Sequence, residues 1–103
     1  MIGLEENIMV EITKDSITDS KLLTDTEKTV LLHMLKWEEW NKVHQRENED
    51  TFILANESGL IEIDAYTLFT AIYHLVELGI LKKRDCDAVA YEWDNKERLE
   101  EFL

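Results

Sequence analysis

Three histidines, one cysteine and 23 acidic side chains are the groups of this 103-residue chain that could carry chemistry. The spacing of His33, His44, His74 and Cys86 does not match a zinc site, and a single cysteine allows no disulfide within the chain. The chain has no nucleophile elbow, phosphate-binding loop, dinucleotide fingerprint or zinc-protease motif. We therefore expect a protein that is not an enzyme and that uses no metal and no cofactor.

The charge of the chain is a stronger signal than any motif. Eleven Lys and Arg residues against 23 Asp and Glu residues leave a formal net charge of −12. This charge opposes binding to a phosphate backbone and adsorption to an anionic membrane surface. It favours a basic partner, because opposite charges steer association, although it would also serve solubility alone.

One basic run and two aromatic pairs stand out against the acidic background. The run of Lys82, Lys83 and Arg84 has two interpretations, contact with phosphates or a solvated strand that offsets nearby acids. Trp37 and Trp40 are three residues apart on an expected helix, and we expect at least one of them in the core. The spacing of Tyr66 and Tyr73 around Phe69 predicts an aromatic stripe that is either a partner interface or ordinary surface.

The composition and the scarcity of the helix-breaking residues proline and glycine predict one small domain with many helices. The chain is 45% hydrophobic, contains no proline and has three glycines. Residues 1–6 lack the basic and apolar regions of a signal peptide, and no apolar stretch is long enough to span a bilayer. We therefore expect a cytoplasmic protein.

The first half of the chain contains one clear helix start. Alternating apolar residues predict a strand over residues 4–12, and the polar stretch 13–22 predicts a linker. Thr24 and Glu27 fit a capping box, which predicts a helix from Thr24 towards His44.

The middle of the chain predicts two helices, each followed by glycine. A short helix is expected over residues 50–58, with Gly59 in the left-handed conformation after it. A longer helix is expected over 64–78, ending at Gly79. The core face of this longer helix is predicted to consist of Leu68, Ile72, Leu75 and Val76.

The last part of the chain predicts a hairpin and a final helix. Strands are expected over residues 80–84 and 88–93, joined by a loop of turn length. Asp94 is the expected N-cap of a short helix over residues 95–103.

The order of these elements resembles a winged helix-turn-helix domain over residues 24–93. Residues 67–84 resemble the recognition helix and first wing strand of phage or plasmid regulators and replication-type proteins, and residues 52–60 resemble their second helix and turn. The resemblance implies an α+β, mostly helical fold, with a winged helix and short C-terminal helix over 24–103. An N-terminal strand and polar linker would occupy residues 1–23.

The expected recognition helix lacks the residues that usually read DNA. Residues 64–78 contain no Lys, Arg, Asn or Gln. We therefore expect a non-enzymatic interaction protein that binds and inhibits or regulates a basic nucleic-acid-binding protein. Small acidic proteins of this type resemble phage or mobile-element inhibitors, such as anti-CRISPR proteins and DNA mimics. The expected partner contacts are Glu38, Glu39, Trp40, Glu62, Asp64, Tyr66 and Tyr73.

Two other functions stay open. A winged-helix transcriptional regulator or replication accessory protein would bind DNA as a homodimer, and a subunit of a larger assembly would expose its acids to solvent. The DNA contacts would be Tyr66, Thr67, Thr70, Tyr73, His74, Lys82, Lys83 and Arg84.

Overall fold

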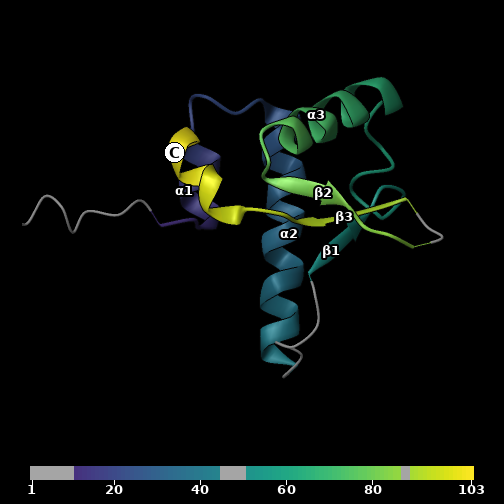
Figure 1. Ribbon diagram of the computed structural model, residues 1–103, viewed down its shortest axis with the longest axis horizontal. Coiled ribbons are helices and arrows are strands. Elements are labelled where there is room, and N and C mark those ends of the chain that lie inside the picture. Colours follow the sequence, from purple (N-terminus) through teal and green to yellow (C-terminus); the bar gives the residue numbers. More distant parts are fainter. Residues whose placement is uncertain (1–10, 45–50, 87–88) are drawn as a thin grey trace, which may run out of the picture.

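The computed structural model describes residues 11–44, 51–86 and 89–103, which form helices and a three-stranded antiparallel sheet. The α+β class is confirmed. In Figure 1, α2 is the long central helix, α3 crosses its first turns, the sheet lies on one side, and α1 and η2 lie on the other. The elements are α1 (Lys14–Asp19), α2 (Asp25–Val43), β1 (Phe52–Leu54), α3 (Ala65–Glu77), β2 (Leu81–Lys83), β3 (Ala90–Trp93) and the 3-10 helix η2 (Lys96–Phe102).

The linker predicted for residues 13–22 is wrong, because this stretch contains α1. The Thr13 hydroxyl accepts a hydrogen bond from the Ser16 amide at 3.1 Å, and the Thr13 amide donates to the Ser16 hydroxyl at 2.8 Å. Ile17 is fully buried in the core, so one apolar residue anchors an otherwise polar helix. The strand predicted for residues 4–12 lies outside the described residues except for positions 11 and 12, which belong to no strand.

The start predicted for α2 is confirmed. The Thr24 amide donates to Glu27 Oε1 at 2.9 Å, and the Glu27 amide donates to the Thr24 hydroxyl at 3.2 Å. This reciprocal pair satisfies donors that the first helical turn leaves unpaired. Val30, Leu31 and Met34 are fully buried, so the first half of α2 forms the centre of the core.

The short helix predicted for residues 50–58 is also wrong. Phe52–Leu54 form β1, which pairs antiparallel with β3 and places Ile53 opposite Tyr91. Both of these side chains are buried, so pairing across the sheet overrides the local helical pattern.

Residues 55–63 form a series of turns between β1 and α3. The Glu57 carboxylate accepts hydrogen bonds from the Leu54 amide and from the Trp37 indole, both at 3.0 Å. Gly59 has the expected positive φ, +94°, but it lies inside the turns and not after a helix. This segment is therefore irregular but well supported by hydrogen bonds.

The helix predicted for residues 64–78 and its glycine exit are confirmed by α3. Gly79 has a φ of +79°. The Gly79 amide donates to the Val76 carbonyl and the Ile80 amide to the Leu75 carbonyl, both at 3.0 Å. These two bonds define a Schellman motif, and the fully buried Ile80 supplies its apolar contact.

The predicted hairpin is confirmed by β2 and β3. The strand order of the sheet is β1-β3-β2, so the last strand inserts between the first two. Leu81, Tyr91 and Ile53 are buried and face the same core as Leu75 of α3. The sheet, α2 and α3 therefore share one hydrophobic core.

The C-terminal helix differs from the predicted one in its N-cap and in its helix type. It is a 3-10 helix whose N-cap is Asn95, so the N-cap predicted at Asp94 is wrong. The Asp94 amide is bound to the Ile80 carbonyl at 2.8 Å, which holds this residue to the start of the hairpin. Leu99 is fully buried, and the Ser20 hydroxyl donates to the Phe102 carbonyl, so η2 packs back beside α1.

Candidate protein-interaction surface

One side of α3 faces solvent. Tyr66 is 80% exposed and Tyr73 is 53% exposed, while Leu68 and Ile72 on the opposite side are buried. The structure places on this exposed side all five α3 residues expected to contact DNA in the alternative function: Tyr66, Thr67, Thr70, Tyr73 and His74.

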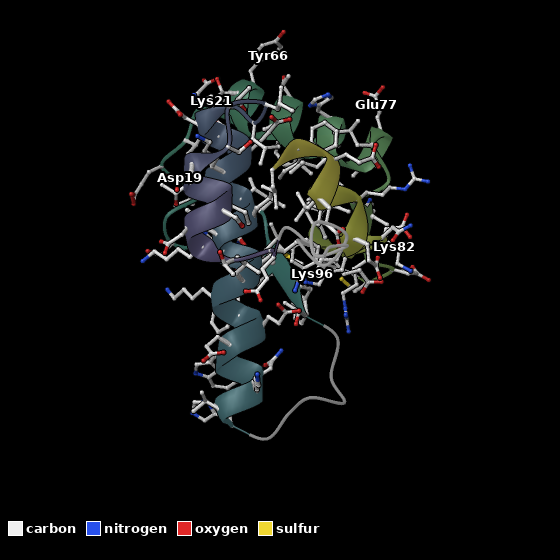
Figure 2. All side chains as sticks on the ribbon, turned by 90° about the vertical axis from the view of Figure 1, so that its left-hand side faces the viewer. Asp19, Lys21, Tyr66, Glu77, Lys82 and Lys96 are labelled. Atoms are coloured by element: carbon white, nitrogen blue, oxygen red, sulfur yellow. The ribbon has the colours of Figure 1, made fainter. Side chains whose placement is uncertain are left out.

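The ends of this exposed side are acidic. The Asp64 carboxylate caps α3 by accepting a hydrogen bond from the Thr67 amide at 3.1 Å. Glu62 is exposed just before it, and Glu77 is exposed at the last residue of the helix. Figure 2 shows Tyr66 and Glu77 projecting outward at opposite ends of α3. Residues 51–80 contain no Lys or Arg, so no permanently charged cation in this part of the chain offsets the acids.

His74 fixes α3 to the start of α2. Its Nδ1 atom contacts Oε2 of Glu27, whose side chain is almost completely buried. The other oxygen of Glu27 completes the capping box with Thr24. His74 therefore has a structural contact that competes with any role in reading bases.

The predicted basic run lies on β2 and the residue after it. Phe52, Glu92 and Lys82 are aligned across the three strands. Lys82 Nζ lies 3.6 Å from Glu92, and Arg84 Nη1 donates to Glu92 at 3.0 Å. The Arg84 guanidinium also lies 4.5 Å from the centre of the Phe52 ring. The central glutamate offsets part of the basic charge, while Lys83 is exposed.

The structure does not bring Glu38, Glu39 and Trp40 together with the α3 residues. They lie in the second half of α2, which extends away from α3 (Figure 1). Glu38 accepts a hydrogen bond from Lys96 Nζ at 2.7 Å, and Glu39 is exposed. Trp40 is 39% exposed and stacks on His44 with ring centres 4.0 Å apart.

Trp37 is the tryptophan that packs against the core, as expected for at least one of the pair. Its ring meets Trp40 edge-on at 5.9 Å. The second half of α2 is therefore a separate surface, with its own aromatic pair.

Tyr73 connects the exposed side of α3 to the sheet. Its phenol neighbours that of Tyr91 of β3. Burial, followed by hydrogen bonding to Tyr73 and the charge of the Tyr73 phenol, raises the pKa of Tyr91 from 10.0 to about 12. The phenol of Tyr91 thus favours its neutral form in the folded protein.

We expect the folded protein to lose stability as pH rises from 10.0 to about 12, the unfolded and folded pKa values of Tyr91. In this window the unfolded chain releases the Tyr91 proton while the folded chain retains it, which favours unfolding. The loss should reach roughly 2 kcal/mol. Urea unfolding at several alkaline pH values measures it, and Tyr91→Phe should show a shallower decline than the unchanged protein. Parallel declines in the two proteins would contradict the assignment.

Of the turn segment 55–63, sequence reasoning selected only Glu62 and missed the apolar residues around it. Together with the start of α3 and Val89, the turn segment encloses a hollow of about 410 Å³. Ile61 is 64% exposed and Val89 is 48% exposed at this hollow. The available signal was the run Leu60-Ile61-Glu62-Ile63, because three large apolar residues are unusual in a turn.

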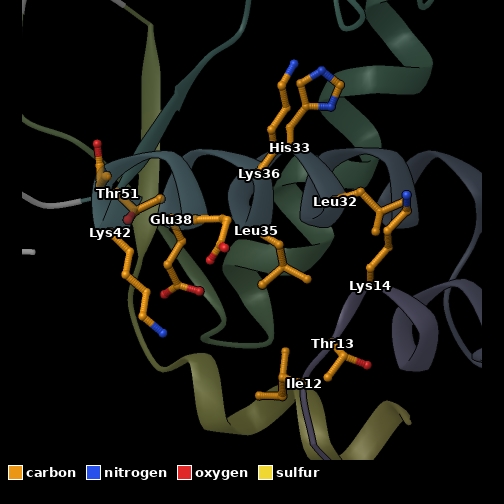
Figure 3. A pocket seen from close by; sticks show the side chains of 12 residues that line it. Ile12, Thr13, Lys14, Leu32, His33, Leu35, Lys36, Glu38, Lys42 and Thr51 are labelled. Carbon is orange, nitrogen blue, oxygen red and sulfur yellow. The ribbon is translucent and has the colours of Figure 1, made fainter. Parts of the chain in front are cut away.

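A larger hollow of about 920 Å³ lies along α2 (Figure 3). Leu35 and Ile12 face one another across it. Charges of both signs surround these apolar residues, including Lys14, Lys42 and Glu38. This mixed lining does not select one chemical class of ligand.

The part of the chain that the structure describes has neither a metal-binding cluster nor a membrane-spanning helix. Within residues 11–44, 51–86 and 89–103, no three His, Cys, Asp or Glu residues are grouped so that they could hold a metal ion. None of the helices described there combines the length and apolar character needed to cross a membrane. Cys86 is exposed on the loop after β2.

The chain matches no protein-family model, no curated protein and no solved structure. Its function is therefore inferred from its own geometry and charge.

Proposed function

We propose that the chain is a winged-helix domain that acts by binding a protein. Helix α2, the turn segment 55–63, helix α3 and the β2–β3 hairpin follow one another in the order typical of this fold. In this assignment α3 occupies the position of the recognition helix and the hairpin is the wing. The chain departs from the winged-helix arrangement at the turn segment, which replaces the short second helix of the family.

One observation carries the choice of a protein partner: the exposed side of α3 presents hydroxyls, aromatic rings and acids, and residues 51–80 contain no Lys or Arg. A recognition helix in the major groove approaches phosphates, which require basic neutralisation. In the basic run of the wing, Lys82 and Arg84 form ion pairs with Glu92. These features support a basic protein surface as the partner of α3.

The proposed partner is a nucleic-acid-binding protein, whose basic surface the chain occupies and thereby inhibits or regulates. Glu62, Asp64 and Glu77 would attract that surface, and the net charge of −12 would accelerate the encounter. Tyr66 and Tyr73 would supply the apolar contact area on which affinity depends. A phage or mobile-element inhibitor is the class that this combination of size and charge suggests.

The test is a competition experiment with immobilised protein. A bacterial lysate cleared of nucleic acid is passed over the protein, and a random DNA duplex is then added to the column. We expect the duplex to release the retained basic proteins, because they would use one surface for both ligands. In parallel, fluorescence anisotropy should detect no binding of the labelled duplex to the protein itself at low salt, the most permissive condition.

Matched charge reversals make this test specific. Glu62→Lys with Glu77→Lys should weaken retention about tenfold or more, whereas Glu100→Lys with Glu101→Lys changes net charge equally on η2 and should have little effect. Equal losses in both double variants would contradict a role for α3. Direct duplex binding that is lost on replacing Lys82, Lys83 and Arg84 with alanine would instead establish the DNA-binding alternative.

A further inference from the structure

We infer that the hollow between the turn segment and α3 binds an apolar side chain presented by a segment rich in lysine and arginine. This inference rests on the proposed function, since it names the part of the basic partner that makes the central contact. The hollow measures about 410 Å³, and its lining includes Ala55, Leu60, Ile61, Ile63, Phe69 and Val89. Apolar pockets of this kind receive the apolar anchor residues of protein partners.

Hydrogen bonds hold the walls of the hollow in place before any partner arrives. The Ala55 amide donates to the Val89 carbonyl at 2.9 Å, which joins the turn segment to the sheet. The Leu60 and Ile61 amides both donate to the Glu57 carbonyl at 3.0 Å. Because these walls are already ordered, a ligand would bind without first organising them.

The hollow has a buried floor and an exposed apolar rim. Leu60 and Leu68 belong to the hydrophobic core and are almost fully buried. Ile61 and Val89, in contrast, leave about half or more of their surface in contact with solvent. An apolar side chain entering between them would remove this surface from water, which is favourable in proportion to its area.

The charges around the hollow identify the occupant. Glu62 is adjacent to Ile61 in the chain, and Asp64 immediately precedes α3, whose Ala65 lines the hollow. Residues 51–80 supply every residue of the lining except Val89, and they contain no Lys or Arg. An anchor flanked by acids would therefore be repelled and one flanked by lysines attracted. A second copy of this chain is disfavoured for the same reason, because it also carries −12.

The experiment uses three labelled short peptides and the full chain. The first has a central leucine flanked by lysines, the second replaces the leucine with serine, and the third replaces the lysines with serines. Anisotropy should give the first peptide a dissociation constant about tenfold lower than that of either other peptide. Backbone amide shifts of Ala55 and Val89 in NMR spectra should report occupation of the hollow by the first peptide.

Two variants with similar exposure localise the site. Ile61→Ser should reduce the affinity for the leucine peptide about tenfold, while Leu22→Ser, at a residue 67% exposed on the connection between α1 and α2, should leave it unchanged. If the leucine and serine peptides bind equally through their lysines, the hollow does not bind the apolar side chain and the inference is wrong. The acidic surface of the proposed function would still be supported. If the third peptide, which lacks lysines, binds as tightly as the first, the occupant need not be basic. This result would contradict the inference and the proposed function as well. Absence of binding by the leucine peptide would also overturn the inference.

Discussion

Replacing Glu27 with alanine should lower the free energy of unfolding by about 3 kcal/mol, a large share of the stability of a small domain. The side chain is 1% exposed and joins two helices. Oε1 accepts the Thr24 amide at 2.9 Å, and Oε2 contacts Nδ1 of His74. Alanine would therefore leave both partner groups without this carboxylate and would also open space in the core.

Urea unfolding measures this effect, and two further variants separate its parts. Asp25→Ala, in the same helical turn but exposed, should cost less than about 1 kcal/mol. Glu27→Gln keeps an oxygen for the Thr24 amide, so we expect an intermediate loss. A loss below 1 kcal/mol for Glu27→Ala would show that the contact between α2 and α3 contributes little to folding.

Replacing Gly59 with alanine should cost about 2–3 kcal/mol, more than the same change at Gly79. Gly59 has a φ of +94°, and a Cβ atom there would lie 2.7 Å from Nε2 of His33. His33 lies within hydrogen-bonding distance of two carbonyls, those of Thr29 at 3.0 Å and Ser58 at 3.2 Å. Moving the ring would therefore disturb contacts within α2 and between α2 and the turn segment.

Gly79→Ala is the matched control for this prediction. Its φ is +79°, but the nearest atom to a new Cβ is Cδ of Arg98 at 3.2 Å, on an exposed side chain that can move. We expect a loss of about 1 kcal/mol, from the backbone conformation alone. In a His33→Ala background the cost of Gly59→Ala should fall towards the same value, since the clash is removed. An unchanged cost in that background would contradict the role of His33.

Sequence-local interactions explain the expectations that the structure confirms. The capping box of Thr24 and Glu27 and the Schellman motif at Gly79 each join residues that lie within six positions of one another. The exposed side of α3 follows from helical periodicity, because buried and exposed positions alternate with the turn of the helix. Residue types and their spacing are sufficient to predict such features.

The features that sequence reasoning got wrong depend on distant partners. Residues 52–54 form a strand because residues 90–92 pair with them, although they match a helical pattern locally. Ile17 stabilises α1 only because its side chain packs into a core formed by residues of other elements. Neither partner can be read from the neighbouring residues.

By itself, the sequence determined the acidic charge, the absence of Lys and Arg from residues 51–80 and the limits of the two main helices. Only the tertiary structure decided which of the expected contact residues share a surface. It separated Trp40 from Tyr66, paired Glu27 with His74, and enclosed the hollow beside Ile61. The physical reason is that charge and capping are properties of the chain or of neighbouring residues, whereas a surface forms only when packing brings distant segments together.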